Sequence, residues 1–69
     1  GQGIAIFDRM HPAGNIVQVY NLNEANRFVN TDELAGLHGT VIDELTGTPI
    51  ALNEGISLAP YEVRWLRQA

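Results

Sequence analysis

The sequence predicts an all-β protein: a small antiparallel β-sandwich of about six or seven short strands with one short helical turn. Short runs of β-branched and aromatic residues recur along the 69 residues, and such runs are typical of strands. Clusters of Gly, Pro, Asn and Asp separate these runs and predict turns between them. The only helical candidate is too short for more than a turn or two. We therefore expect a single domain over residues 1–69.

The N-terminal half contains three predicted strands. The run 4–7 is the first, and it ends at the Pro- and Gly-containing turn 11–15. The run 16–22 is the strongest strand, and it is apolar on both faces, as expected for a central strand that is covered on both sides. Residues 23–26 read as a turn, and 27–29 as a return strand.

The C-terminal half begins with the helical candidate at residues 30–37. Asn30 can cap it, acidic residues occupy its first turn, and a glycine can end it. Residues 40–43 and 48–52 then form a predicted hairpin, in which Pro49 restricts the second strand to an edge or a strand start. A further turn precedes the alternating run 56–58.

The last predicted strand alternates strictly from residue 61 to residue 66. Successive side chains of a strand point to opposite faces, so one face carries Tyr61, Val63 and Trp65, and the other carries Glu62, Arg64 and Leu66. Burying one aromatic side chain removes about 150–250 Å² from water. The aromatic face is therefore predicted to be core and the charged face to be solvated. In the alternative, Trp65 is a sugar platform with Glu62 and Arg64 as polar arms.

Composition narrows the classes of partner. The net charge is −4 and the four basic residues are scattered arginines, which excludes nucleic acid and anionic membranes as expected partners. No apolar run approaches the roughly 20 residues that cross a bilayer, and the first residues lack a signal-peptide layout. With no cysteine present, these features favour a cytoplasmic protein. Because so small a domain is marginally stable, we expect a partner or a longer parent chain.

The segment IDELTGTPIALNEGISLAPYEVRWL resembles the C-terminal end of α-amylase superfamily enzymes, whose closing β-sandwich is called domain C. The positions that carry the resemblance are Asp43, Leu45, Thr46, Gly47, Ile56, Leu58, Pro60, Tyr61, Trp65 and Leu66. Amylosucrases and related sucrose-acting enzymes are the most similar branch, through the Pro, Tyr, Trp and Leu spacing. The resemblance implies a parent that acts on α-glucosidic bonds of sucrose or α-glucans by a retaining mechanism. This chain is then its C-terminal accessory domain, which packs on and stabilises the catalytic (β/α)8 barrel.

No residue is predicted to be catalytic, cofactor-binding or metal-binding. A retaining glycosidase needs two carboxylates about 5 Å apart, and the resemblance implies that these lie in the barrel. The adjacent pairs 32–33 and 43–44 fall at a predicted helix start and a predicted turn, where acidic side chains cap and are solvated. His11 and His38 also lie in turn contexts, without a third ligand at metal spacing.

Two other functions remain open. In the first, the chain is a carbohydrate-binding module for α-glucans. Its candidate glycan contacts are Tyr20, Gln18 on the same strand face, and Asn21, which follows them. In the second, the chain is an unrelated small interaction domain.

Overall fold

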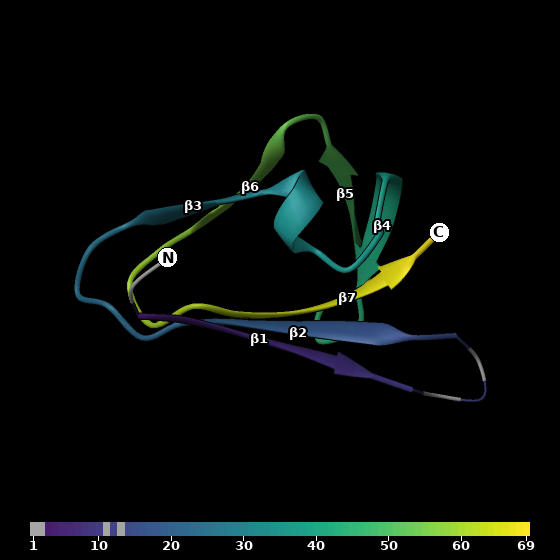
Figure 1. Ribbon diagram of the computed structural model, residues 1–69, viewed down its shortest axis with the longest axis horizontal. Coiled ribbons are helices and arrows are strands. Elements are labelled where there is room, and N and C mark those ends of the chain that lie inside the picture. Colours follow the sequence, from purple (N-terminus) through teal and green to yellow (C-terminus); the bar gives the residue numbers. More distant parts are fainter. Residues whose placement is uncertain (1–2, 11, 13) are drawn as a thin grey trace.

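The chain folds into seven strands and one 3-10 turn in its computed structural model, which describes residues 3–10, 12 and 14–69 (Figure 1). This confirms the prediction of a small all-β domain with one short helical turn. The elements are β1 (Ile4–Arg9), β2 (Ile16–Asn21), β3 (Arg27–Asn30), η1 (Thr31–Glu33), β4 (Gly39–Asp43), β5 (Thr48–Leu52), β6 (Gly55–Leu58) and β7 (Val63–Gln68).

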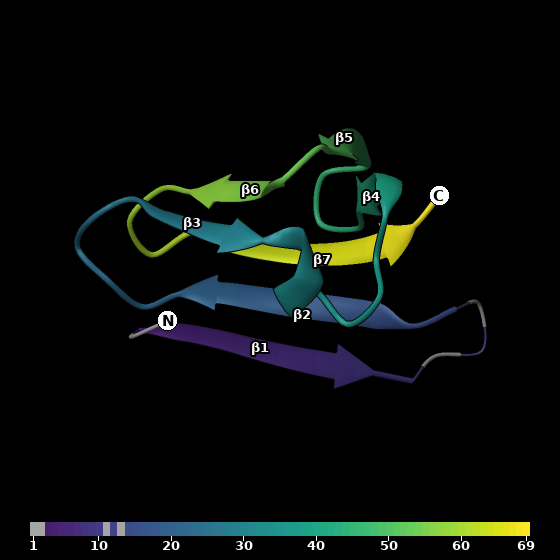
Figure 2. The same ribbon diagram turned by 45° about the horizontal axis from the view of Figure 1, so that its top comes forward.

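The strands form two antiparallel sheets that lie one above the other (Figure 2). The larger sheet has five strands in the order β1-β2-β7-β4-β5, and the smaller one pairs β3 with β6. The segment 27–29 was expected to return beside the strand before it, and this was wrong. It crosses to the other layer, where Val29 lies opposite Ile56, because both residues there join the core.

The core fills the space between the two sheets, and within the described part of the chain its hydrophobic side chains are all aliphatic. Alternation along each strand directs every second side chain into it. The segment around η1 adds two leucines and covers the centre of the larger sheet (Figure 1). The buried hydrophobic residues are Val17, Val19, Val29, Leu34, Leu37, Val41, Leu52, Ile56, Leu58 and Leu66.

The predicted β4–β5 hairpin is confirmed, and so is the effect of its proline. Pro49 lies on β5, which is one of the two edge strands of the larger sheet. A proline has no backbone N–H to donate to a neighbouring strand, so an edge is the position that tolerates it. The helical candidate shortens to the single turn η1, which begins after Asn30. The Asn30 backbone N–H donates to the Glu33 carboxylate at 3.2 Å.

The prediction that the aromatic face of the last strand is core was wrong. Leu66 is 0% exposed and lies opposite both Val17 and Asp43, whereas Trp65 faces the other way and is half-buried. Tyr61 precedes β7, in a turn, with φ +59° and an exposed side chain. The physical reason is that β3, β6 and η1 cover one face of the larger sheet, and that face carries Leu66.

The aromatic residues of the other strands lie outside the core as well. Phe7, Phe28 and Tyr61 are exposed, and Tyr20 and Trp65 are half-buried. The second layer has only two short strands and one helical turn, so it can cover one side of the five-stranded sheet and no more. Most of the aromatic surface is left on the other side.

Candidate functional site

The candidate site is the side of the five-stranded sheet that points away from β3 and β6, which we call the outer face. Along β2, the buried side chains of Val17, Val19 and Asn21 alternate with the half-buried ones of Ile16, Gln18 and Tyr20. The first set faces the core, so the second set faces outward. The apolar residues of the outer face are Ala5, Phe7, Ile16, Tyr20, Ile42, Pro49, Ala51, Val63 and Trp65.

Strand register arranges these side chains in rows that cross β1, β2 and β7. Phe7 lies opposite Gln18, and Gln18 lies opposite Trp65. In the adjacent row, Tyr20 lies between Ala5 and Val63. The Phe7 and Tyr20 rings make an edge-to-face contact, with centroids 5.8 Å apart and an interplanar angle of 79°. Such contacts hold rings in a fixed arrangement, so the two rows form an ordered aromatic surface.

The next row of the outer face carries charge. Ile16 lies between Arg9 on β1 and Arg67 on β7. The Arg67 guanidinium forms an ion pair with Glu44. The Arg9 guanidinium lies 5.8 Å from the centre of the Phe7 ring, and its Nε donates to Gln18 Oε1 at 3.4 Å. A cation over an aromatic ring is a weak but directional attraction.

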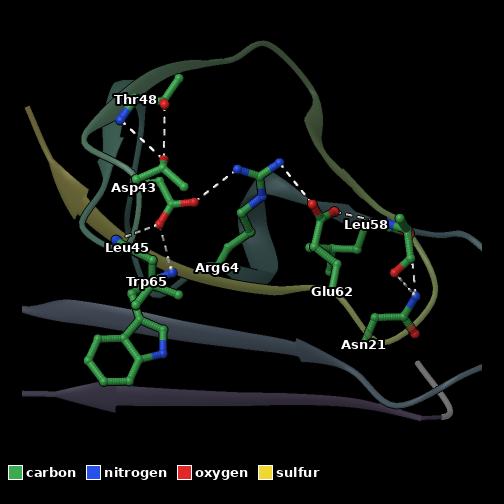
Figure 3. A network of polar contacts seen from close by, with 10 residues as sticks. Asn21, Asp43, Leu45, Thr48, Leu58, Glu62, Arg64 and Trp65 are labelled. Atoms are coloured by element: carbon green, nitrogen blue, oxygen red, sulfur yellow. Dashed lines mark hydrogen bonds and ion pairs between the residues drawn. The ribbon is translucent and has the colours of Figure 1, made fainter.

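A polar network occupies the opposite, core-facing side of β7 (Figure 3). Asp43, which is 1% exposed, accepts hydrogen bonds from the backbone N–H of Leu45 at 3.0 Å and of Trp65 at 3.4 Å. Arg64 donates to Asp43 at 2.9 Å and forms a second ion pair with Glu62 at 3.1 Å. The expectation that Asp43 and the charged face of the last strand are solvated was therefore wrong. Each of these charges is buried or half-buried and has a partner.

Neither acidic pair converges on a reaction centre. Asp43 points into the core while its neighbour Glu44 is exposed and bound to Arg67. Adjacent residues of a strand diverge in this way by geometry. At the 3-10 turn, Asp32 and Glu33 are both exposed. Neither pair therefore presents two carboxylates to one position of a substrate.

The structure brings together two of the three candidate glycan contacts. Tyr20 and Gln18 are half-buried neighbours on the outer face. Asn21 points the other way and is 1% exposed. Its amide Nδ2 donates to the carbonyl oxygens of Ala25 at 3.0 Å, Leu58 at 3.3 Å and Ala59 at 2.9 Å. Figure 3 shows Asn21 beside Leu58.

Among the described residues, Asn21 and Asp43 are the polar residues classed as buried, and the sequence analysis predicted burial for neither. Asn21 joins the end of β2 to the start of the turn between β6 and β7 through its bonds to Leu58 and Ala59. It also accepts a bond from the Asn23 backbone N–H at 3.0 Å. The only available signal was their position at the ends of apolar strands, next to turns. Exposed polar residues share that signal.

Metal-binding and membrane-spanning features are not found among the described residues. No group of three or more His, Cys, Asp or Glu side chains there is placed to hold a metal ion. His38 is exposed, and His11 lies outside the described residues. The described part of the chain also contains no helix with the length and apolar character needed to cross a membrane.

Comparison with known proteins gives one result. A family model described as "Amylosucrase, C-terminal domain" matches residues 2–67. A search of curated proteins finds no match to the chain. The family match covers every strand except the last residue of β7.

Proposed function

Because the chain belongs to the amylosucrase C-terminal domain family, we propose that it is the non-catalytic accessory domain that covers and stabilises the catalytic (β/α)8 barrel of the same parent chain. A domain of this family is a C-terminal accessory domain of an amylase-family enzyme. The parent is proposed to act on α-glucosidic bonds of sucrose or α-glucans by a retaining mechanism, with both catalytic carboxylates in the barrel.

The observation that carries this proposal is the uncovered outer face. Five strands carry apolar side chains on both faces, and the second layer of the domain covers only one. Exposed apolar patches larger than a few hundred Å² mark interaction sites. Each Å² of apolar surface removed from water contributes about 25 cal/mol. Docking of the outer face against the barrel therefore stabilises the domain and the barrel together.

A matched pair of phenylalanines tests the proposal. Phe7 on the outer face is 46% exposed, and Phe28 on β3 in the other sheet is 54% exposed. In the full-length parent, Phe7→Asp is expected to lower the melting temperature and to speed proteolytic cleavage between the domains, whereas Phe28→Asp is expected to do neither. Equal effects of the two substitutions, or no effect of either, would contradict the proposal.

A second candidate function, carbohydrate binding, is favoured by one specific feature. The Gln18 amide lies in a row between Phe7 and Trp65 and next to Tyr20, and aromatic rings beside an amide are a common sugar-binding pattern. Titration of the chain with maltooligosaccharides separates the two functions. A saturable dissociation constant below about 1 mM, or about −4 kcal/mol, that is lost in Tyr20→Ala would favour binding of glycans over docking to the barrel.

A further inference from the structure

The charges of the outer face differ from those of the whole chain. The chain carries eight acidic and four basic residues, a net charge of −4. Register and alternation place Arg9 and Arg67 on the outer face, and Glu44, in the turn after β4, joins them through its ion pair with Arg67. The remaining acidic residues of the five-stranded sheet, such as Asp8 and Asp43, alternate to the other side. The outer face therefore carries two arginines and one glutamate, a net charge of +1, on a domain whose net charge is −4.

Arg9 is the charge of this face that has no opposite charge beside it. Arg67 is paired with Glu44, and on the core-facing side Arg64 is paired with Asp43. In the described part of the chain, no carboxylate pairs with Arg9, whose contacts are the Phe7 ring and Gln18 Oε1. These two contacts place the exposed guanidinium beside the aromatic surface.

Docking of the outer face removes water from the Arg9 guanidinium. A guanidinium that loses water without gaining an anion is strongly unfavourable, because its solvation is not replaced. The favourable solution is a carboxylate that accepts two parallel N–H bonds from the planar guanidinium. The partner that covers Phe7 also approaches Arg9, since the two side chains are in contact.

Resting on the proposed function above, we propose that the barrel surface covering the outer face presents a carboxylate to Arg9. The partner surface is then apolar opposite the rows that contain Trp65 and Tyr20, and acidic opposite the end of the row that contains Arg9. Because Arg9 lies on β1, at one edge of the sheet, this pairing fixes the direction in which the domain sits on the barrel.

The test uses the full-length parent and a matched control. Arg27 on β3 is also exposed, and among the described residues its guanidinium has one hydrogen bond, to the carbonyl oxygen of Asn26 at 3.2 Å. Arg9→Glu and Arg27→Glu therefore make the same charge change at exposed positions in different sheets of the domain, and only Arg9 belongs to the outer face. We expect Arg9→Glu to raise the rate of proteolytic cleavage between the domains at least about tenfold, and Arg27→Glu to leave it unchanged.

Two further measurements identify the acceptor. Arg9→Gln is expected to raise the cleavage rate less than Arg9→Glu does. The difference between the cleavage rates of the two variants should become smaller as the salt concentration is raised. In the Arg9→Glu protein, replacement of acidic residues of the barrel by arginine, one at a time, is expected to restore docking at one position. Equal effects of Arg9→Gln and Arg9→Glu at all salt concentrations would indicate a neutral acceptor and overturn the proposal.

The outcomes also separate this inference from the proposed function. If Phe7→Asp speeds cleavage between the domains but Arg9→Glu changes it no more than Arg27→Glu does, the proposal of docking through the outer face is supported. The proposal of a carboxylate partner for Arg9 is then wrong. If Phe7→Asp does not change the cleavage rate, the proposal of docking through the outer face is wrong, and so is the proposal of a carboxylate partner for Arg9.

Discussion

Arg64 on β7 and Asp43 on β4 form an ion pair of 2.9 Å on the core-facing side of the larger sheet (Figure 3). The Asp43 side chain is 1% exposed and that of Arg64 is 25% exposed. The β4–β7 ladder pairs Asp43 with Leu66 at its end. The ion pair extends the connection between the two strands beyond this point, towards Glu62, whose carboxylate also binds Arg64 at 3.1 Å.

Arg64→Ala is expected to lower the free energy of unfolding of the chain by about 2–3 kcal/mol, because it leaves the Asp43 charge buried without its partner. Arg27→Ala, at an exposed position of β3, is the control and is expected to change it by less than about 0.5 kcal/mol. Urea unfolding of both variants measures the difference. Similar stabilities of the two variants would show that Asp43 does not depend on Arg64.

Asn21→Asp is expected to destabilise the chain more than Asn21→Ala does. The aspartate would place a negative charge where the amide now donates to three carbonyl oxygens. The alanine only removes the donor, at a cost of about 1–3 kcal/mol. Thermal unfolding of both variants measures which is less stable, and Asn53→Ala, in an exposed turn, is the control. An aspartate variant as stable as the alanine variant would contradict this role of the Asn21 amide.

Trp65→Ala and Leu66→Ala test which face of β7 is core. Leu66 is 0% exposed, so its loss is expected to cost about 2–5 kcal/mol, much of the roughly 3–10 kcal/mol available to a domain of this size. Half-buried Trp65 is expected to cost about 1–2 kcal/mol in the chain alone. Denaturant unfolding ranks the two variants. A Trp65→Ala chain less stable than Leu66→Ala would reverse the assignment of faces.

The chain alone is expected to release no reducing sugar from sucrose, maltose or starch. Its two adjacent carboxylates at the end of β4 point apart, and both are bound to arginine. A reducing-sugar assay against buffer measures this. Turnover that co-purifies with the chain and disappears in Glu44→Gln would contradict the non-catalytic role.

Strand positions and turns were predictable because their signals are local. The run that became β2, the hairpin around residues 44–47 and the edge position of Pro49 all follow from residue types within a few positions. Pairing across the two layers was not predictable in the same way. Nothing within the segment 27–29 indicates that its partner lies nearly thirty residues further on, at Ile56.

The choice of core face on β7 was missed for a different reason. Both faces of that strand carry apolar side chains, and the size of Trp65 favoured the wrong one. Alternation shows that Trp65 and Leu66 point in opposite directions, but it does not show which side the second layer covers. Burial of Asn21 and Asp43 was missed because it depends on carbonyl oxygens and an arginine far away in the sequence.

The place of β7 in the larger sheet has a consequence for synthesis of the protein. β7 is the last strand in the sequence, yet it lies between β2 and β4 and joins two separate hairpins, β1–β2 and β4–β5. On a translating ribosome, each hairpin can form as it emerges, but neither has a neighbour on its inner edge until β7 follows. Isolated hairpins are marginally stable in water, and unpaired edges invite association between chains. The larger sheet is therefore completed only after β7 has been synthesised. A ribosome that stops before β7 releases a chain in which the inner edges of both hairpins, β2 and β4, are open for chaperones and proteases to recognise.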